Sequence, residues 1–276
     1  MEGFKPFEPE KKKKFIIPEN AVESGPEIKF EKGLGRKSDY NWEVIRELEA
    51  PIGNLVNQLK ESIDKEEYDA IIGDDISGRI PTLALRKIFV SRIHELNPNL
   101  TAEEGREKLK TFFVVGGHRK QNDRKLLEFF KKIKPNIKKR LLFVTEYKNS
   151  GRSLLRISKL LEKVGIHFDI AAVIEESHIS GAVKDDEFIV RGHNIFVGSF
   201  GGEPKIYHKK FLTGLASKLH NNKLHNLEEH YPKDAHAHVD DSGLKKRAVV
   251  PFLKQARQDV DLLASNILEK VWGDKH

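Results

Sequence analysis

A short polar loop between a buried strand and a helix carries the residues best suited to chemistry. The stretch RLLFVTEYKNSGRSLL begins as an apolar strand, passes through Asn149 to Ser153 and continues as a helix. Gly151 allows the backbone to turn tightly, and the free amides of the helix start favour an anion. Ser150 and Ser153 add hydroxyl donors, and Arg152 adds positive charge. The pattern predicts a phosphate-binding loop, with an ordinary turn and serine N-cap as the competing interpretation.

An acid just before this loop favours the functional interpretation. Glu146 stands at the end of an apolar strand, where a carboxylate is costly unless it is used or paired. The sequence therefore predicts a phosphate-binding loop with one carboxylate beside it.

The stretch LLFVTEYKNSGRSL resembles the ribose-phosphate signature of the type I phosphoribosyltransferases. The resemblance implies that paired acids hold the ribose hydroxyls of 5-phosphoribosyl-1-pyrophosphate (PRPP) and that the glycine turn wraps the 5-phosphate. Thr145 stands where the first acid is expected and Glu146 where the second is, and both are taken as the catalytic positions. The turn matches well, so its residues are expected to bind phosphate: Asn149, Ser150, Gly151, Arg152 and Ser153.

Two further stretches resemble the pyrophosphate-binding parts of the same family. IIGDDISGRIPTLAL is similar to its pyrophosphate loop, although Ile76 stands where an arginine is common and Arg79 would have to substitute. A plain tight turn is the alternative. FFVVGGHRKQND places basic residues directly after another strand, where a solvated loop is the alternative. The residues expected to bind pyrophosphate are Asp75, Ser77, Gly78, Arg79, His118, Arg119 and Lys120.

The resemblance implies transfer of a phosphoribosyl group from PRPP to a nitrogen nucleophile, or binding of a nucleoside monophosphate. Mg²⁺ is the implied cofactor, and because it keeps several waters it needs only one or two carboxylates. Glu146 is the first candidate, and Asp75, or Asp74 in its place, is a partner through water. Two departures argue against routine purine salvage: Thr145 removes an acid, and Asn149 replaces an aspartate and cannot take a proton. The alternative is a weakly active or inactive regulatory protein that senses PRPP or a nucleotide.

The elements that must position these loops show the sequence pattern typical of a parallel sheet. Apolar runs at YDAIIG, TFFVVGG, RLLFVTE and FDIAAVIEES are separated by amphipathic helices, which predicts an α/β fold with an open parallel sheet flanked by helices. DEFIVRG and NIFVGSF are expected as further strands. Residues 42–63 have the period of a helix that Pro51 kinks, and residues 249–272 carry a heptad-like stripe. That stripe is expected to dock on its own chain, with a homodimer seam as the alternative.

The resemblance covers about residues 40 to 215. We expect an N-terminal extension at 1–38, a phosphoribosyltransferase-like domain at 39–219 with a small hood-like element at PKIYHKKFLTGL, and a histidine-rich connector with the C-terminal helix at 220–276. A polar connector is favoured over a zinc or nickel site for the histidines. The residues considered for that site are His225, Glu229, His230, His236, His238 and Asp240.

The composition excludes some kinds of chemistry and favours anionic partners. The chain of 276 residues has no cysteine, so disulfides and thiolate chemistry are excluded. No apolar run has the length of a membrane span, and no secretory signal is recognisable, so a soluble cytoplasmic protein without a membrane partner is expected. The net charge of +7 favours anionic partners such as phosphorylated metabolites. A nucleic-acid-binding protein is a third hypothesis, which charge alone does not establish.

Overall fold

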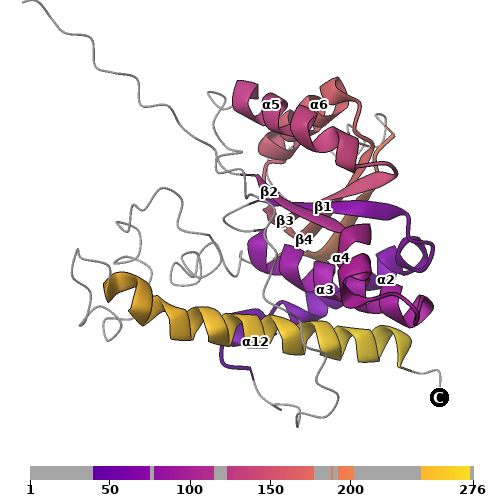
Figure 1. The fold of residues 1–276 in the computed structure, drawn as a ribbon. Coiled ribbons are helices and arrows are strands. Elements are labelled where there is room, and N and C mark those ends of the chain that lie inside the picture. Colours follow the sequence, from indigo (N-terminus) through magenta and orange to yellow (C-terminus); the bar gives the residue numbers. More distant parts are fainter. Residues whose placement is uncertain are drawn as a thin grey trace, which may run out of the picture. The chain divides into compact units, whose positions relative to one another are not determined.

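The structure is a computed structural model that describes residues 40–74, 78–114, 123–176, 188, 192–201 and 244–273, with backbone only for 74 and 244–254 (Figure 1). The N-terminal extension, the hood-like element and the histidine-rich connector expected from the sequence lie outside these residues. Among the described residues, no helix is both long enough and apolar enough to cross a membrane.

The core is a sheet of five parallel strands in the order β2-β1-β3-β4-β5. This confirms the predicted α/β fold with an open parallel sheet flanked by helices. β1 to β4 are the apolar runs that the sequence predicts as buried on both faces, whereas β5 comes from NIFVGSF, expected in a cap or at the sheet edge, and forms an edge of the sheet. The strands are β1 (Tyr68–Asp74), β2 (Lys110–Val114), β3 (Arg140–Lys148), β4 (Phe168–Glu175) and β5 (Ile195–Phe200).

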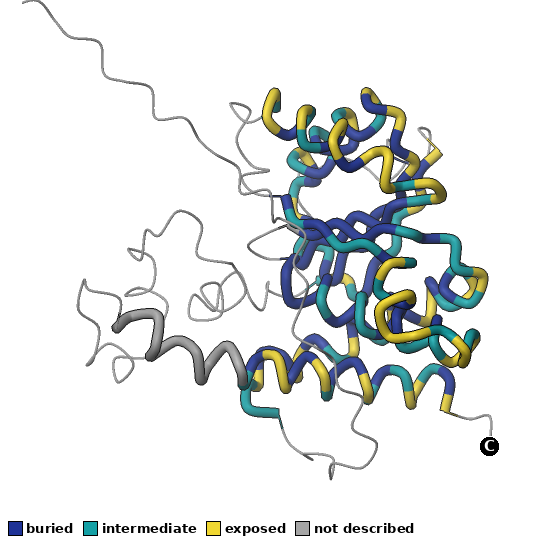
Figure 2. Tube along the Cα trace, viewed as in Figure 1, coloured by how far each residue is buried: buried dark blue, intermediate teal, exposed yellow. Residues whose placement is uncertain are grey.

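Helices cover both faces of the sheet (Figure 1). The helices are α1 (Glu43–Arg46), α2 (Glu49–Asp64), α3 (Arg79–Leu96), α4 (Ala102–Lys108), α5 (Asp123–Ile133), α6 (Arg152–Val164) and α12 (Leu244–Trp272), with a 3-10 helix, η2, at Lys134–Asn136. Alternate residues of β3 serve the two faces: Leu142 and Val144 pack with α2, α3 and α12, whereas Leu141 and Phe143 pack with α5 and α6. Figure 2 shows most of the sheet buried between these layers; β3 and β4 are almost fully buried, and the edge strands β2 and β5 are partly exposed.

Two local expectations need correction, and one helix was not predicted. Pro51 lies in the first turn of α2, where a missing amide costs no hydrogen bond, so it does not kink the helix, and the break from α1 falls before Glu49. In DEFIVRG, Phe188 has helical backbone geometry and is fully buried, because so short an apolar run is compatible with helix as well as strand. The sequence reading missed α4, although Thr101 and Glu104 form a capping box at its start.

The C-terminal helix α12 docks on its own chain. Its stripe is buried in the same core as α2 and α3, through Ala256, Val260, Leu263, Ala264 and Ile267. The predicted docking on the chain's own core is therefore confirmed.

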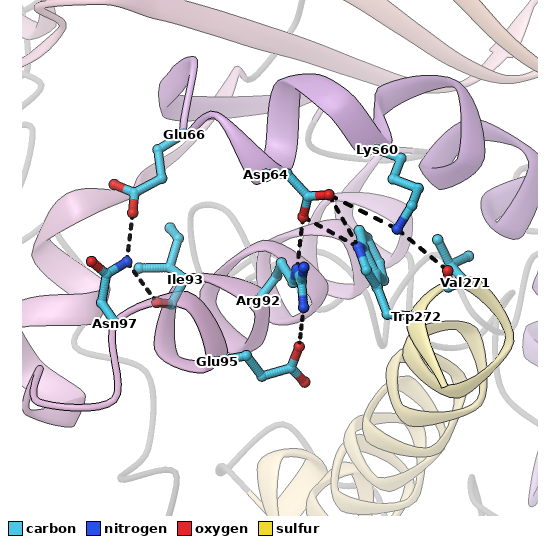
Figure 3. Close-up of polar contacts among 9 residues, drawn as sticks. All are labelled: Lys60, Asp64, Glu66, Arg92, Ile93, Glu95, Asn97, Val271 and Trp272. Atoms are coloured by element: carbon cyan, nitrogen blue, oxygen red, sulfur yellow. Dashed lines mark hydrogen bonds and ion pairs between the residues drawn. The ribbon is translucent and has the colours of Figure 1, made fainter. Parts of the chain in front are cut away.

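Trp272 anchors the C-terminal end of α12 (Figure 3). Its indole Nε1 donates to Asp64 at 3.2 Å, and the ammonium of Lys60 lies 4.4 Å from the ring centroid. Arg92 of α3 donates to the same Asp64 at 2.7 Å and lies 5.3 Å from the indole ring. Two cations and one carboxylate thus fix the tryptophan, and with it α12, to α2 and α3.

The first turn of α2 also holds α12, through a carboxylate that must stay ionised. Glu49 accepts hydrogen bonds from the Tyr40 hydroxyl at 2.7 Å and the Asn266 amide at 3.1 Å, and it pairs with Lys270. Burial alone would raise the pKa of Glu49, but the bonds from Lys270, Tyr40 and Asn266 together hold it below the ordinary value of 4.5. A carboxyl whose pKa falls on folding stabilises the folded state above the unfolded pKa.

We therefore expect the free energy of unfolding to fall as the pH drops below 4.5 and through the folded pKa of Glu49. The variant Glu49→Gln should show a shallower fall over this window, because it has no proton to take up. Urea unfolding at a series of acidic pH values measures both slopes. Glu107→Gln, on an exposed position of α4, is the control and should keep the wild-type slope. Equal slopes for wild type and Glu49→Gln would contradict this account.

Candidate functional site

The turns after β1 and β3 follow neighbouring strands, at the point where the order of the strands reverses. The chain leaves β1 through α3 on one face to reach β2, and then crosses through α5 on the other face to reach β3, which pairs with the opposite edge of β1. In open parallel sheets, ligands bind outside the carboxyl ends of the strands at such a switch point. The loops that follow β1 and β3 are the two that flank this point.

The turn between β3 and α6 has the geometry that the sequence predicts for a tight loop. Gly151 is the N-cap of α6 with φ 68° and ψ −5°, a left-handed conformation that favours glycine. It has no side chain to cap the helix, so the first amides of α6 receive no cap from it. Gly151 is buried, Ser150 is half-buried and Arg152 is exposed. The turn therefore presents backbone donors beside a charged side chain.

The acid predicted beside this turn is buried in the sheet. Glu146 is fully buried and Thr145 is 5% exposed. Val144 pairs in register with Gly73 of β1, and β3 continues beyond this pair through Thr145 and Glu146 to Lys148. The strand thus carries both predicted catalytic positions past the end of its pairing with β1, toward the edge that holds Gly151.

The start of α3 lies at the same edge of the sheet. Gly78 is the N-cap of α3 and has right-handed backbone angles, φ −80° and ψ −9°, so its conformation does not require glycine. The guanidinium of Arg79 is mostly buried and lies 4.3 Å from the ring centroid of Phe113, next to the last residue of β2. Arg79 thus brings a cation to the carboxyl ends of β1 and β2.

The glycine that the start of α3 approaches closely is Gly73, near the end of β1. A Cβ on Gly73 would lie 2.2 Å from Oγ1 of Thr82 and 3.3 Å from the carbonyl oxygen of Gly78. The end of β1 and the first turn of α3 therefore pack without room for any side chain at position 73. The remaining residues expected to bind pyrophosphate lie outside the described part of the chain: Asp75, Ser77, His118, Arg119 and Lys120.

The sequence reading missed a polar cluster beside the turn, at the carboxyl ends of β3 and β4. Lys148 is 2% exposed and pairs with Glu175 at 2.6 Å. Glu176 accepts from the Tyr147 hydroxyl at 2.6 Å and from the Asn149 amide at 3.2 Å. Glu175 and Glu176 near the end of FDIAAVIEES were a usable signal, because charges at the end of an otherwise apolar strand need partners.

The same polar cluster fixes the side chain of Asn149. Because its amide is held by Glu176, it lies against the end of β4 and is oriented by that strand.

In the described part of the chain, no three histidine or acidic side chains are grouped closely enough to hold a metal ion by themselves.

No protein-family model and no curated protein matches the chain. Among solved structures it is similar to a purine phosphoribosyltransferase from Pyrococcus horikoshii Ot3, with 16% identity and a TM-score of 0.27 over 52% of this chain and 80% of that one. It is also similar to a phosphoribosyltransferase from Corynebacterium diphtheriae, with 15% identity and a TM-score of 0.28 over 58% of this chain and 94% of that one. Because identities and TM-scores are this low, neither similarity carries an argument about substrate or activity.

The described sheet and the turn at Gly151 define the structural class of the protein without the comparisons. The chain is an open-sheet α/β protein with a left-handed glycine turn at its switch point and a buried carboxylate in the strand that leads to it.

Proposed function

We propose that the chain binds PRPP or a nucleoside monophosphate together with Mg²⁺ and transfers the phosphoribosyl group to a nitrogen nucleophile. The observation that carries the proposal is the left-handed Gly151 at the start of α6, at the switch point and five residues after the fully buried Glu146. A sugar phosphate needs backbone donors for its phosphate and an acceptor for its hydroxyls, and this short stretch supplies both.

Each side chain has a role in this proposal. The amides at the start of α6, with Ser150, Ser153 and Arg152, bind the 5-phosphate and fix the position of the ribose. Glu146 accepts hydrogen bonds from ribose hydroxyls. Arg79, at the ends of β1 and β2, is placed to offset negative charge on the departing pyrophosphate. Reaction at C1 then depends on alignment and charge stabilisation and needs no protein nucleophile.

In this proposal Glu146 would provide a hard oxygen ligand for a magnesium ion, and Asp75 is a second candidate from the sequence. One or two carboxylates would suffice, because Mg²⁺ keeps several waters. When bound, the ion would supply positive charge that offsets the pyrophosphate.

Glu146 allows a direct test of this arrangement. We expect Glu146→Gln to weaken PRPP binding in the presence of Mg²⁺ by about 2 kcal/mol, or roughly 30-fold in Kd, because the amide loses the charge that strengthens its contacts. Calorimetric titration of PRPP with and without Mg²⁺ measures the loss. Glu61→Gln, at a position whose side chain is 80% exposed, is the control. An unchanged Kd in Glu146→Gln, with its fold confirmed by thermal melting, would remove Glu146 from the site.

The second candidate is a regulatory protein that binds the same ligand without turning it over. Thr145 favours it, because a neutral hydroxyl stands where the resemblance expects an acid, and it is nearly buried beside Ala172. A pyrophosphate-release assay with a panel of nucleobases separates the two. Release with any base supports the transferase, whereas tight binding of PRPP without release under all conditions supports the sensor.

A further inference from the structure

A cation on α3 lacks the partner that its burial calls for. In the described part of the chain, Nε of Arg86 is buried and has no hydrogen-bond partner, and no carboxylate pairs with its guanidinium. Burial lowers the pKa of Arg86, and the charge of Arg106 on α4 lowers it further. Arg86 is half-buried, and a partly desolvated charge next to a like charge costs stability, so the arrangement favours an anion from outside these residues.

The positive charge extends from α3 to α12. Burial lowers the pKa of the neighbouring Lys87, and the charges of Arg86 and Arg257 add to that effect. Lys87 also pairs with Asp261 of α12. Arg257 is exposed on α12, and Arg106 is half-buried on α4. We call Arg86, Lys87, Arg106 and Arg257 the basic row.

The sequence of α12 continues this charge beyond the row. From Leu244 to Arg257 the helix contains basic residues and no acid. The basic residues of this half are Lys245, Lys246, Arg247, Lys254 and Arg257. A series of cations that spans three helices fits an extended anion better than a single phosphate group.

We propose that the basic row binds the sugar-phosphate backbone of a nucleic acid. Arginine suits phosphate oxygens because its guanidinium donates two parallel hydrogen bonds. An anionic membrane is the less favoured partner, because membrane binding also needs exposed apolar side chains. Among the described residues the exposed large hydrophobic side chains are Leu96 and Phe200, and neither is part of the row.

The test uses the full chain and a fluorescein-labelled oligouridylate, with labelled duplex DNA as a second probe. Fluorescence anisotropy at a series of salt concentrations gives Kd and its salt dependence. We expect the triple variant Arg86→Gln, Arg106→Gln, Arg257→Gln to bind about tenfold or more weakly. The slope of log K against log salt should fall by about 2, because roughly three phosphate contacts are lost.

The matched control removes the same charge from the opposite face of the sheet. Arg124→Gln, Lys131→Gln, Lys132→Gln changes three exposed cations of α5 and should leave both quantities at wild-type values. Should Arg86→Gln fail to fold, the double variant of Arg106 and Arg257 makes the same test with a smaller change.

Several outcomes would overturn the proposal. It fails if the wild-type chain binds neither probe, if the α5 control loses as much affinity as the row variant, or if the row variant retains affinity and salt slope. Binding only to phosphatidylserine vesicles would also overturn it. Loss of oligouridylate binding in Gly151→Val with normal binding in the row variant would assign the nucleic acid to the β3–α6 turn. This proposal does not depend on the proposed transferase function.

Discussion

Replacement of Gly151 by valine is expected to abolish PRPP binding while the protein still folds. Gly151 has φ 68° at the start of α6, a conformation that costs a β-branched residue about 1–3 kcal/mol. Relief of that strain would rotate the peptide planes of the first amides of α6, which the proposed function assigns to the phosphate. In that proposal the valine side chain would also occupy the space of the phosphate. We expect a loss of roughly 100-fold or more in Kd, measured by calorimetry with PRPP and Mg²⁺.

A second glycine of the same helix provides the control. Gly165 is the C-cap of α6 and has φ 74°, so Gly165→Val imposes similar backbone strain at the opposite end of the helix. Both variants should lose comparable stability in thermal melts, and only Gly151→Val should lose PRPP binding. Equal affinities in the two variants would mean that the turn at Gly151 is only a structural connection, and the proposed phosphate site would have to be abandoned.

Replacement of Gly198 by alanine is expected to cause a large loss of stability. A Cβ at this position of β5 would lie 2.3 Å from the carbonyl oxygen of Pro51 and 2.6 Å from that of Val173. Neither atom belongs to a flexible side chain, so α2 or β4 must move. The movement would also disturb the hydrogen bonds from Asn54 to the Gly198 carbonyl at 3.0 Å and from Gln58 to the Val197 carbonyl at 2.7 Å. We expect a loss of about 3 kcal/mol in the free energy of unfolding, measured with urea.

The same substitution at Gly53 should instead raise the free energy of unfolding. Gly53 lies within α2, and a Cβ there would lie 4.0 Å from Cγ1 of Ile267, an ordinary van der Waals contact. Gly53→Ala should therefore stabilise the protein by about 0.5–1 kcal/mol, because alanine is the better helix former. If both variants change stability by the same amount and sign, the tight contact between α2 and β5 is not what requires glycine at position 198.

Local pattern was enough to predict most of the elements and the turn of the candidate site. Apolar runs such as RLLFVTE indicated strands buried on both faces, and helix periodicity between them implied a parallel sheet. The glycine after NS also indicated a tight turn, and the structure shows that Gly151 makes it in the left-handed conformation that glycine adopts readily. These features depend on neighbours in the chain, and the sequence contains that information directly.

The same reasoning failed where two interpretations fit one short stretch. Pro51 disrupts a helix interior but is harmless in a first turn, and only the position of the helix start distinguishes the two. Phe188 belongs to an apolar run too short to show a period. The roles of Asp75, Ser77 and the basic loop at 118–120 remain predictions, because those residues lie outside the described ranges.

Tertiary structure alone decided which distant residues meet. The strand order that puts the turn after β3 beside the turn after β1 depends on crossovers, and no local pattern encodes it. Three features depend on atoms far apart in the chain: the pairing of Lys148 with Glu175, the lack of a partner for Nε of Arg86 among the described residues, and the requirement for glycine at position 198. Sequence periodicity fixes which face of an element is buried, whereas contacts between elements also depend on their relative packing, which only the folded chain specifies.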